Sequence, residues 1–306
     1  MVRVPIPPHL SSAPFAVNDG LEAGLGEKRL RGSDLTSPFW GVRIAASPDT
    51  LQERARAYST RMQLDAFFSH TTAAGLHEIP LPLALRSATL HVSSAADLRG
   101  PTGRGVIGHH LHIDPRDIAR VQGLSVTSLE RTVMDLAHSL DDEAMVAALD
   151  NVLWWRRDPA TRATPRSLDD AFHRFRGRRG RARLREFIPF ATDRSDSPPE
   201  STFRLRFLRE GFPVPEPNVE IYDDLGQFIA MPDLQFKRYK MAIDYEGDHH
   251  RTDRIQWQRD IQRVPRLEDA GWHHTRLSAL DLAYPAEVLG RIRKHLVSRG
   301  WRPGHA

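Results

Sequence analysis

The sequence predicts an α/β protein of two domains, a C-terminal domain with a mixed sheet flanked by helices and an N-terminal domain that is mostly α+β. Between Tyr239 and Glu246, apolar residues alternate with polar or small ones, and this period of two is typical of a strand. After Ser197 the expected order is helix, three strands, helix, strand and helix, which is typical of a sheet covered by helices. A length of 306 residues is comfortable for two domains.

Arginine gives the chain its basic character. The sequence holds 43 lysine and arginine residues, mostly arginine, against 39 acidic ones, with a formal charge of +4 and a pI of about 9.7. The planar guanidinium suits phosphate, but a genome rich in G and C would produce the same bias. Composition alone therefore leaves a nucleic-acid partner open.

Several classes of protein are excluded by composition. The chain lacks cysteine, which rules out disulfides and thiolate zinc sites and is typical of a reducing compartment. Prolines interrupt the beginning, MVRVPIPPHLSSAPFAV, before any apolar run of signal-peptide length. No segment approaches the roughly 18 apolar residues of a membrane span. We therefore expect a soluble cytoplasmic protein without a membrane partner.

The N-terminal residues are expected to be less ordered than the rest. Residues 1–27 mix proline, serine and glycine without periodicity, so we expect a flexible tail. The N-terminal domain then covers residues 28–190. Its first segment, Leu30 to Ile44, is interpreted as a docking segment anchored by Phe39 and Trp40.

Caps and periodicity predict the next elements. Asp49 is expected to cap a helix beginning near Thr50, and a run of helix, turn and loop begins near Met62. Strands are expected at 89–93 and 105–113. The second strand carries three histidines, interpreted as surface or hydrogen-bonded core residues: His109, His110 and His112.

Two helices follow, and they carry a first resemblance. Helical spacing predicts a helix behind a cap at Thr127 or Ser128 and a second one from Asp142 to about Trp155. With the upstream stretch SHTTAAGLHEIPLP, this part of the chain, beginning at Phe67, resembles the C-terminal module of abortive-infection (type IV) antitoxins. The resemblance implies a module that binds DNA or a protein partner.

The sharpest concentration of charge is AFHRFRGRRGRARLR, residues 171–185. One interpretation is two short helices joined at glycines, with solvated arginines. The other is a phosphate-contacting arm in which Arg178, Arg179, Arg181 and Arg183 bind nucleic acid.

The C-terminal domain is expected over residues 197–306, after the linker-like stretch TDRSDSPP. A helix begins near Glu200, and the stretch DDLG at 223–226 marks a hairpin turn. Asp233, Asp244 and Glu246 then converge on one expected hairpin. Their like charges repel unless a cation or shifted pKa values relieve them.

These acids carry a second resemblance. Pro232-Asp233 followed by Asp244-Tyr245-Glu246 resembles the PD-(D/E)xK nuclease motif, and IDYEGDHH with RTDRIQWQRDIQRVPRLEDAGW resembles its very-short-patch-repair-like branch. The similarity runs from Ser197 to about Arg299 and implies a restriction-endonuclease-like fold. Glu246 stands where the motif has its lysine.

The resemblance implies roles for the acids. Asp233 and Asp244 hold Mg²⁺ or Mn²⁺, and Glu200 acts through water or a second ion. Glu246 is either a third ligand or the base for the attacking water.

Residues after the hairpin complete the implied site. His250 is the candidate acid–base group, while Gln258 and Arg259 are candidates to replace the lysine's charge or hydrogen bond, with Arg259 also contacting nucleic acid. A zinc site is the alternative for Asp244 with His249, His250, His273 and His274, but adjacent histidines on a strand point to opposite faces.

The sequence therefore predicts a metal-dependent DNA endonuclease with an N-terminal module that binds DNA or a partner. The alternative is a non-enzymatic DNA-binding regulator or antitoxin-like protein with a degenerate nuclease fold. Convergence of Glu200, Asp233 and Asp244 to roughly 4–5 Å between carboxylate oxygens, with a shared ion, favours the first function, and a basic side chain filling their pocket favours the second.

Overall fold

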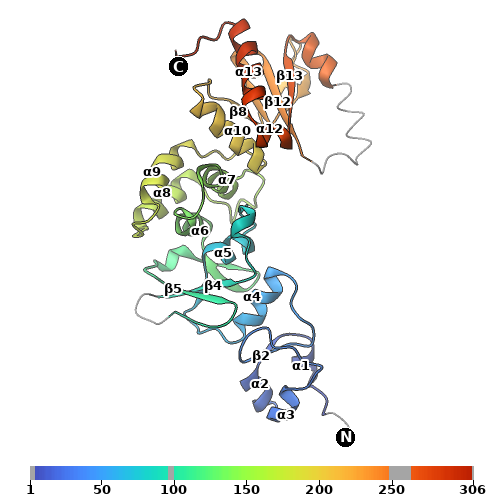
Figure 1. The fold of residues 1–306 in the computed structure, drawn as a ribbon, viewed down its shortest axis with the longest axis vertical. Coiled ribbons are helices and arrows are strands. Elements are labelled where there is room, and N and C mark those ends of the chain that lie inside the picture. Colours follow the sequence, from blue (N-terminus) through green and yellow to red (C-terminus); the bar gives the residue numbers. More distant parts are fainter. Residues whose placement is uncertain (1–3, 96–99, 248–262, 305–306) are drawn as a thin grey trace. The chain divides into compact units, whose positions relative to one another are not determined.

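A computed structural model of the chain describes residues 4–95, 100–247 and 263–304. Within these ranges no helix is both long enough and apolar enough to span a bilayer. Helices and several mixed sheets alternate along the chain (Figure 1). The protein is therefore of the mixed α/β class.

The chain folds into two compact units. Unit 1 comprises Met1–Leu140 and Ala163–Ile188, and unit 2 comprises Asp141–Arg162 and Pro189–Ala306. The sequence placed the domain boundary between residues 190 and 197, which is close to Pro189, where the chain enters unit 2 for the second time. The segment before Ala163 differs from expectation, since it packs with the C-terminal unit.

Helix α7 (Asp142–Leu153) explains this difference. Its Asp150, 1% exposed, accepts two hydrogen bonds of 2.8 Å from the guanidinium of Arg204 on helix α10 (Pro198–Arg209). Ser201 of the same helix donates to Asp150 at 2.7 Å. Because the apolar periodicity of a helix does not name its packing partner, the sequence did not reveal this contact.

The N-terminal residues of unit 1 are ordered rather than a flexible tail from Val4 onward. A small hydrophobic core is formed here by four buried residues, Leu10, Phe15, Leu25 and Leu30. It holds short elements that are too brief to give a periodic pattern: α1 (Pro8–Ser11), β1 (Phe15–Ala16), α2 (Val17–Glu22), α3 (Glu27–Leu30) and β2 (Val42–Arg43).

The expected docking anchor is half correct. Phe39 is 3% exposed and belongs to the main core of unit 1, but Trp40 is 82% exposed. The guanidinium of Arg61 lies over the Trp40 ring at 5.0 Å from its centroid. Trp40 therefore packs against arginine at the surface.

Unit 1 is built on a five-stranded mixed sheet of order β5-β4-β3-β7-β6. The pairs β4/β5 and β3/β7 are parallel, and β3/β4 and β6/β7 are antiparallel. The sequence predicted β4 and β5 but not the three others. The strands are β3 (Phe67–Phe68), β4 (Leu90–Ala95), β5 (Val106–Leu111), β6 (Ile118–Val121) and β7 (Leu124–Thr127).

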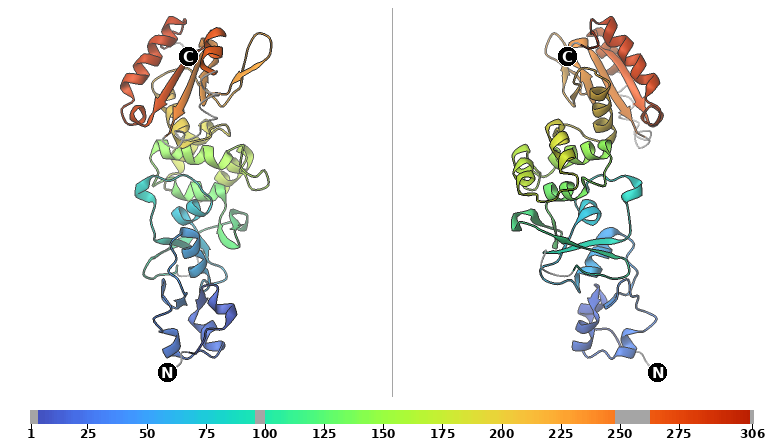
Figure 2. Two further views of the ribbon diagram at one scale, coloured as in Figure 1. Left: turned by 90° about the vertical axis from the view of Figure 1, so that its right-hand side faces the viewer. Right: turned by 60° about the vertical axis from the view of Figure 1, so that its left-hand side comes forward.

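Two helices share one hydrophobic core with the strands of this sheet (Figure 2). Helix α4 (Leu51–Ser59) is capped by Thr50, whose hydroxyl accepts from Glu53 N at 3.2 Å, so the cap lies one residue after the expected Asp49. Helix α5 (His70–Leu76) follows β3 directly. Two 3-10 turns lie in loops, η1 (Leu83–Leu85) and η2 (Pro115–Asp117).

Three further helices complete unit 1. Ser128 caps α6 (Leu129–Leu136), as one of the two expected residues. Two short helices cover the arginine-rich stretch, α8 (Pro165–Arg174) and α9 (Arg181–Phe187), with Gly180 at a φ of 78° before the second. The 3-10 turn η3 (Ile188–Phe190) follows.

Unit 2 contains a four-stranded mixed sheet of order β13-β12-β11-β8. Strand β11 (Leu234–Phe236) is antiparallel to β8 (Glu216–Pro217) and, after turn η4 (Lys237–Tyr239), to β12 (Met241–Glu246), which is parallel to β13 (His273–Ser278). The expected turn at 223–226 joins a separate hairpin, β9 (Ile221–Tyr222) and β10 (Phe228–Ala230).

Helices cover one face of this sheet and mixed elements cover the other. Met241 and Ile243 pack with α10 and α13 (Ala286–Ser298), whereas Ala242 packs with the β9/β10 hairpin and with residues 263–269, which are helical. Helix α12 (Ala279–Ala283) connects β13 to α13. Other elements therefore flank both faces of the sheet. Because β11 and β12 are antiparallel, the start of β11 and the end of β12 lie together at one end of these two central strands, and we call this the strand-end edge of the sheet.

Candidate functional site

Three buried or partly buried acids meet at this edge of the sheet in unit 2, and we call Glu200, Asp233 and Asp244 the carboxylate site. Glu200 lies in the first turn of α10 and is 4% exposed. Its Oε2 accepts hydrogen bonds of 2.8 Å from Asp196 N and from Asn218 Nδ2. The backbone N–H of Asn218 donates to the carbonyl of Asp233 at 3.1 Å, so one asparagine links the first two acids.

The antiparallel β11/β12 pair brings the second and third acids together. Asp233 directly precedes β11, and Asp244 lies near the end of β12. Asp233 N donates to Asp244 Oδ1 at 3.3 Å, and Tyr245 N donates to Asp233 Oδ2 at 2.6 Å. The hairpin therefore brings Asp233 and Asp244 together, whereas Glu246, which was expected to converge with them, does not join them.

Burial and mutual repulsion shift the pKa values of two of these acids. Burial, followed by the charge of Asp233, raises the pKa of Glu200 to about 7. Burial, followed by the charge of Asp244, raises the pKa of Asp233 to about 6. Ionising all three carboxylates at neutral pH is therefore costly.

Asp244 differs because it has two cationic or proton-donating neighbours. Burial alone would raise the pKa of Asp244, but His274 and Arg263 outweigh burial and hold the pKa below its usual value. The Arg263 guanidinium donates to Asp244 Oδ1 at 2.6 Å, and His274 Nε2 lies 2.6 Å from Oδ2. A basic side chain thus occupies the pocket beside the acids.

In this arrangement the carboxylate site is not closed around a cation. Among the described residues, the ligand atoms of these three acids do not all lie within 4.8 Å of one another. Arg263 and His274 compensate the charge of Asp244 instead.

The other predicted residues of this site lie apart or outside the described ranges. Glu246 is exposed and forms an ion pair of 2.8 Å with Arg276 on β13. His250 and Arg259 lie outside the described residues, as do His249 and Gln258.

The four arginines predicted to bind nucleic acid divide into two pairs. Arg181 donates to the carbonyl of Phe172 at 3.1 Å, and Arg183 donates to the carbonyl of Ala137 at 2.8 Å, where α6 ends. Such contacts satisfy carbonyls at helix ends. Arg178 and Arg179 are exposed and line a cavity in unit 1.

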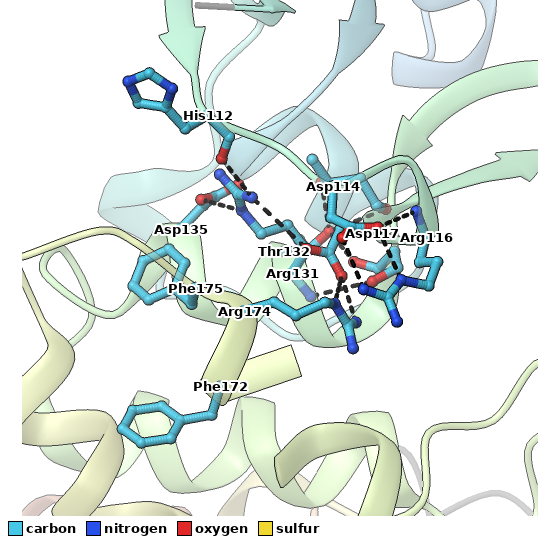
Figure 3. Close-up of polar contacts among 12 residues, drawn as sticks. His112, Asp114, Arg116, Asp117, Arg131, Thr132, Asp135, Phe172, Arg174 and Phe175 are labelled. Carbon is cyan, nitrogen blue, oxygen red and sulfur yellow. Dashed lines mark hydrogen bonds and ion pairs between the residues drawn. The ribbon is translucent and has the colours of Figure 1, made fainter. Parts of the chain in front are cut away.

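A buried ion-pair network lies beside this cavity (Figure 3). Arg131 donates to Asp135 at 2.8 Å and lies 3.9 Å from Asp117, which also accepts from Arg174 of α8. Burial raises the pKa of Asp135 to about 6, although Arg131 lowers it. The network anchors α8 against α6.

A second cluster, not expected from the sequence, lies in the same cavity, and we call it the histidine site. His70, His91 and His109 each offer one ring nitrogen, and these atoms all lie within 4.8 Å of one another. His109 was expected to be a surface or hydrogen-bonded core histidine, His70 lies in the stretch SHTTAAGLHEIPLP without an assigned role, and His91 carried no motif. They come from α5, β4 and β5, so only knowledge of the β3/β4/β5 pairing would have grouped them.

Comparisons with known proteins give relatives without a described function. No family profile matches the chain. It is 27% identical over 273 residues to two uncharacterized proteins, MT2308 and Rv2248, of Mycobacterium tuberculosis strains CDC 1551 / Oshkosh and ATCC 25618 / H37Rv, covering 88% of this chain and 94% of each relative. A crystal structure of the RV2827C protein from Mycobacterium tuberculosis covers 69% of this chain and 83% of that one, with 13% identity and a TM-score of 0.39.

Proposed function

We propose that unit 2 is a metal-dependent DNA endonuclease that hydrolyses phosphodiester bonds at the carboxylate site. The observation that carries this proposal is the linkage of three acids from three elements, α10, the start of β11 and β12, through Asn218 and the β-hairpin backbone. Burial and like charge raise the pKa values of Glu200 and Asp233, so ionising both costs stability, although Arg263 and His274 compensate the charge of Asp244. Such a cost is typical of functional sites.

The donor set fits a hard divalent cation. All three side chains offer carboxylate oxygens, the ligands that Mg²⁺ and Mn²⁺ prefer. Asp233 and Asp244 would hold the ion, and Glu200 would act through water. A bound ion supplies charge neutralisation for the scissile phosphate and a more acidic water.

The chain's own residues contribute positioning and charge. Asn218 and the Asp196 amide orient Glu200, and Tyr245 N orients Asp233. Arg263, beside Asp244, can turn toward a phosphate when a cation takes over the compensation of Asp244. Arg263 would then supply the positive charge that the lysine supplies in the nuclease motif.

A restriction-endonuclease-like fold for unit 2 is part of the proposal. It is supported by the sequence helix, three antiparallel strands, helical residues 263–269 and a parallel fourth strand. In unit 1, exposed Arg178 and Arg179 support a module that binds DNA or a protein partner.

A second candidate function is a non-enzymatic DNA-binding regulator or antitoxin-like protein with a degenerate nuclease fold. The contacts of Arg263 and His274 with Asp244 favour it, because a compensated aspartate needs no cation. In that case unit 2 binds DNA and never cuts it.

Cleavage of a supercoiled plasmid and of a labelled duplex, with Mg²⁺, Mn²⁺ or a chelator, tests the proposal. We expect cleavage only with the metal, its loss in Asp233→Asn, and no change in Asp224→Asn, which alters an exposed acid of the β9/β10 turn. Thermal midpoints of all three proteins verify folding. Binding of the duplex without cleavage under every condition would overturn the endonuclease in favour of the regulator.

A further inference from the structure

The histidine site combines ligands from three elements of unit 1. His91 Nδ1 lies 2.9 Å from His109 Nε2, and the ring of His109 stacks on that of His70 with centroids 3.9 Å apart. In the parallel β4/β5 pair, His109 faces Ser93, two residues from His91, so both rings project from the same face of the sheet. His70 begins α5 beside that face.

The spacing of the nitrogens suits a tetrahedral metal. Zinc binds histidine nitrogen at about 2.0–2.1 Å, so two ligand nitrogens of a tetrahedral site lie roughly 3.3 Å apart. The His91–His109 distance of 2.9 Å is shorter by only a few tenths of an ångström. The rings of His70 and His91 lie at 21° and 19° to that of His109, so the rings must turn about their side-chain bonds to direct their nitrogens at a shared ion.

Neighbouring groups fix the orientation of His70. Ser69 Oγ lies 2.9 Å from His70 Nδ1 and 2.5 Å from Ser93 Oγ, a buried partner on β4. A hydrogen bond at one ring nitrogen leaves the other for a metal and is the usual support of a ligating histidine. His70 also has a φ of 49°, a left-handed conformation that costs a non-glycine residue energy and concentrates at functional sites.

The three histidines lie in buried surroundings. Burial, followed by the charges of neighbouring histidines, lowers the pKa of His70 to about 3 and that of His109 to about 4. Burial also lowers the pKa of His91.

The site opens into a basic cavity of about 750 Å³. Arg176, Arg178 and Arg179 line it and are exposed. Asp135, which is paired with Arg131, also lines it.

We propose that His70, His91 and His109 bind a divalent transition metal of the zinc class, with a coordination position open to an anionic ligand in the arginine-lined cavity. Three histidines with a fourth open position are the pattern of a zinc site that binds water or substrate. The arginines fit a phosphate or carboxylate group at that position. This site is independent of the carboxylate site, since it lies wholly within unit 1.

Cobalt and zinc binding by the full-length chain test the inference. We expect Co²⁺ to give the intense visible absorption of a four-coordinate site, and Zn²⁺ to displace it with a dissociation constant in the micromolar range or below. His109→Ala should weaken zinc binding by more than roughly 100-fold, beyond the 10–100-fold cost of losing a residue that only orients a ligand. His112→Ala, an exposed histidine just beyond β5, is the matched control and should bind as the parent does.

Each part of the inference has a result that overturns it. If His109→Ala loses its fold, as thermal midpoints would reveal, His91→Gln replaces it with the same expected loss of binding. Equal zinc affinity in these variants and the parent would reduce the histidines to stacked packing. An unchanged cobalt spectrum on adding inorganic phosphate would remove the open position, and a shift that disappears in Arg178→Gln/Arg179→Gln would support it.

Discussion

Burial shifts the pKa values of titratable groups in opposite directions at the carboxylate site of unit 2 and at the histidine site of unit 1. In the first, burial raises the pKa values of Glu200 and Asp233, so neutral pH imposes charge repulsion. In the second, burial lowers the pKa values of His70 and His109, so neutral pH leaves uncharged ligands. A hard cation would therefore relieve the repulsion of the acids, whereas a borderline-soft one would suit the proposed histidine ligands.

The two sites also differ in compensation. Asp244 already has Arg263 and His274 as partners, so a cation at the carboxylate site competes with residues of the chain. At the histidine site, the described ring contacts are among the histidines themselves and Ser69. Experiments that separate charge, compensation and neutral ligation therefore sharpen the comparison.

The largest effect is expected from Asp244→Asn on β12, with Glu246→Gln on the same strand as its comparison. Asp244→Asn removes a charge shared with Asp233, so DNA cleavage should fall by roughly 100-fold or more, the scale of groups that act at a reacting centre. Glu246→Gln should cost less than about tenfold, because Glu246 is exposed and paired with Arg276. Initial cleavage rates with Mg²⁺ measure both, and equal losses would return Glu246 to the carboxylate site.

Arg263 provides the next effect. Arg263→Ala removes the competing cation from Asp244, so the dissociation constant for Mn²⁺ should fall by about tenfold, corresponding to about 1.4 kcal/mol. Calorimetric titration at low salt measures it, with Arg266→Ala, an exposed arginine one turn later, as the control. Unchanged or weaker Mn²⁺ binding in Arg263→Ala would favour the regulator that does not cut DNA.

Two pairs of arginines in unit 1 are expected to differ in effect, one pair on the affinity for duplex DNA and the other on the thermal stability of the protein. Replacing Arg178 and Arg179 with glutamine would remove the two proposed phosphate contacts, so the slope of log affinity for duplex DNA against log salt should flatten by about 1.8. Replacing Arg181 and Arg183 should instead lower the thermal midpoint, because these side chains bind backbone carbonyls. Fluorescence anisotropy at several salt concentrations decides, and an identical slope would make Arg178 and Arg179 a solvated surface.

The smallest expected effect concerns pH. Because the folded pKa of Glu200 is raised to about 7, its contribution to stability is complete below about pH 4.5 and is lost as pH rises through 7. Glu200→Gln should therefore match the parent near pH 4.5 and exceed it near pH 8 by a few degrees, at roughly 2–4 °C per kcal/mol. Thermal midpoints with a chelator measure this, and a difference that does not change with pH would refute the assigned cause.

The sequence predicted the proximity of Asp233 and Asp244 because these two residues are local. Asp233 and Asp244 sit on adjacent strands joined by a short turn, so alternation and turn length fix their proximity. Glu200 followed from the resemblance alone. The compensating contact of His274 depends on the β12/β13 parallel pairing, which requires a crossover and leaves no local pattern.

The histidine site could not be predicted in the same way. His70, His91 and His109 become neighbours only through the order β5-β4-β3, and β3 is two residues long, too short for a recognisable period. The placement of α7 in unit 2 was missed for a related reason, since its buried partner Arg204 is far along the chain. Long-range pairing, rather than local propensity, set the limit.

Crossed metal titration of the full-length chain tests most directly whether each unit holds its own metal site. Mn²⁺ and Zn²⁺ are titrated calorimetrically into the parent, Asp233→Asn and His109→Ala. We predict that Asp233→Asn loses Mn²⁺ binding and keeps the high-affinity Zn²⁺ site, whereas His109→Ala loses that Zn²⁺ site and keeps Mn²⁺ binding. Loss of both metals in either folded variant, or of neither metal in both, would contradict the account.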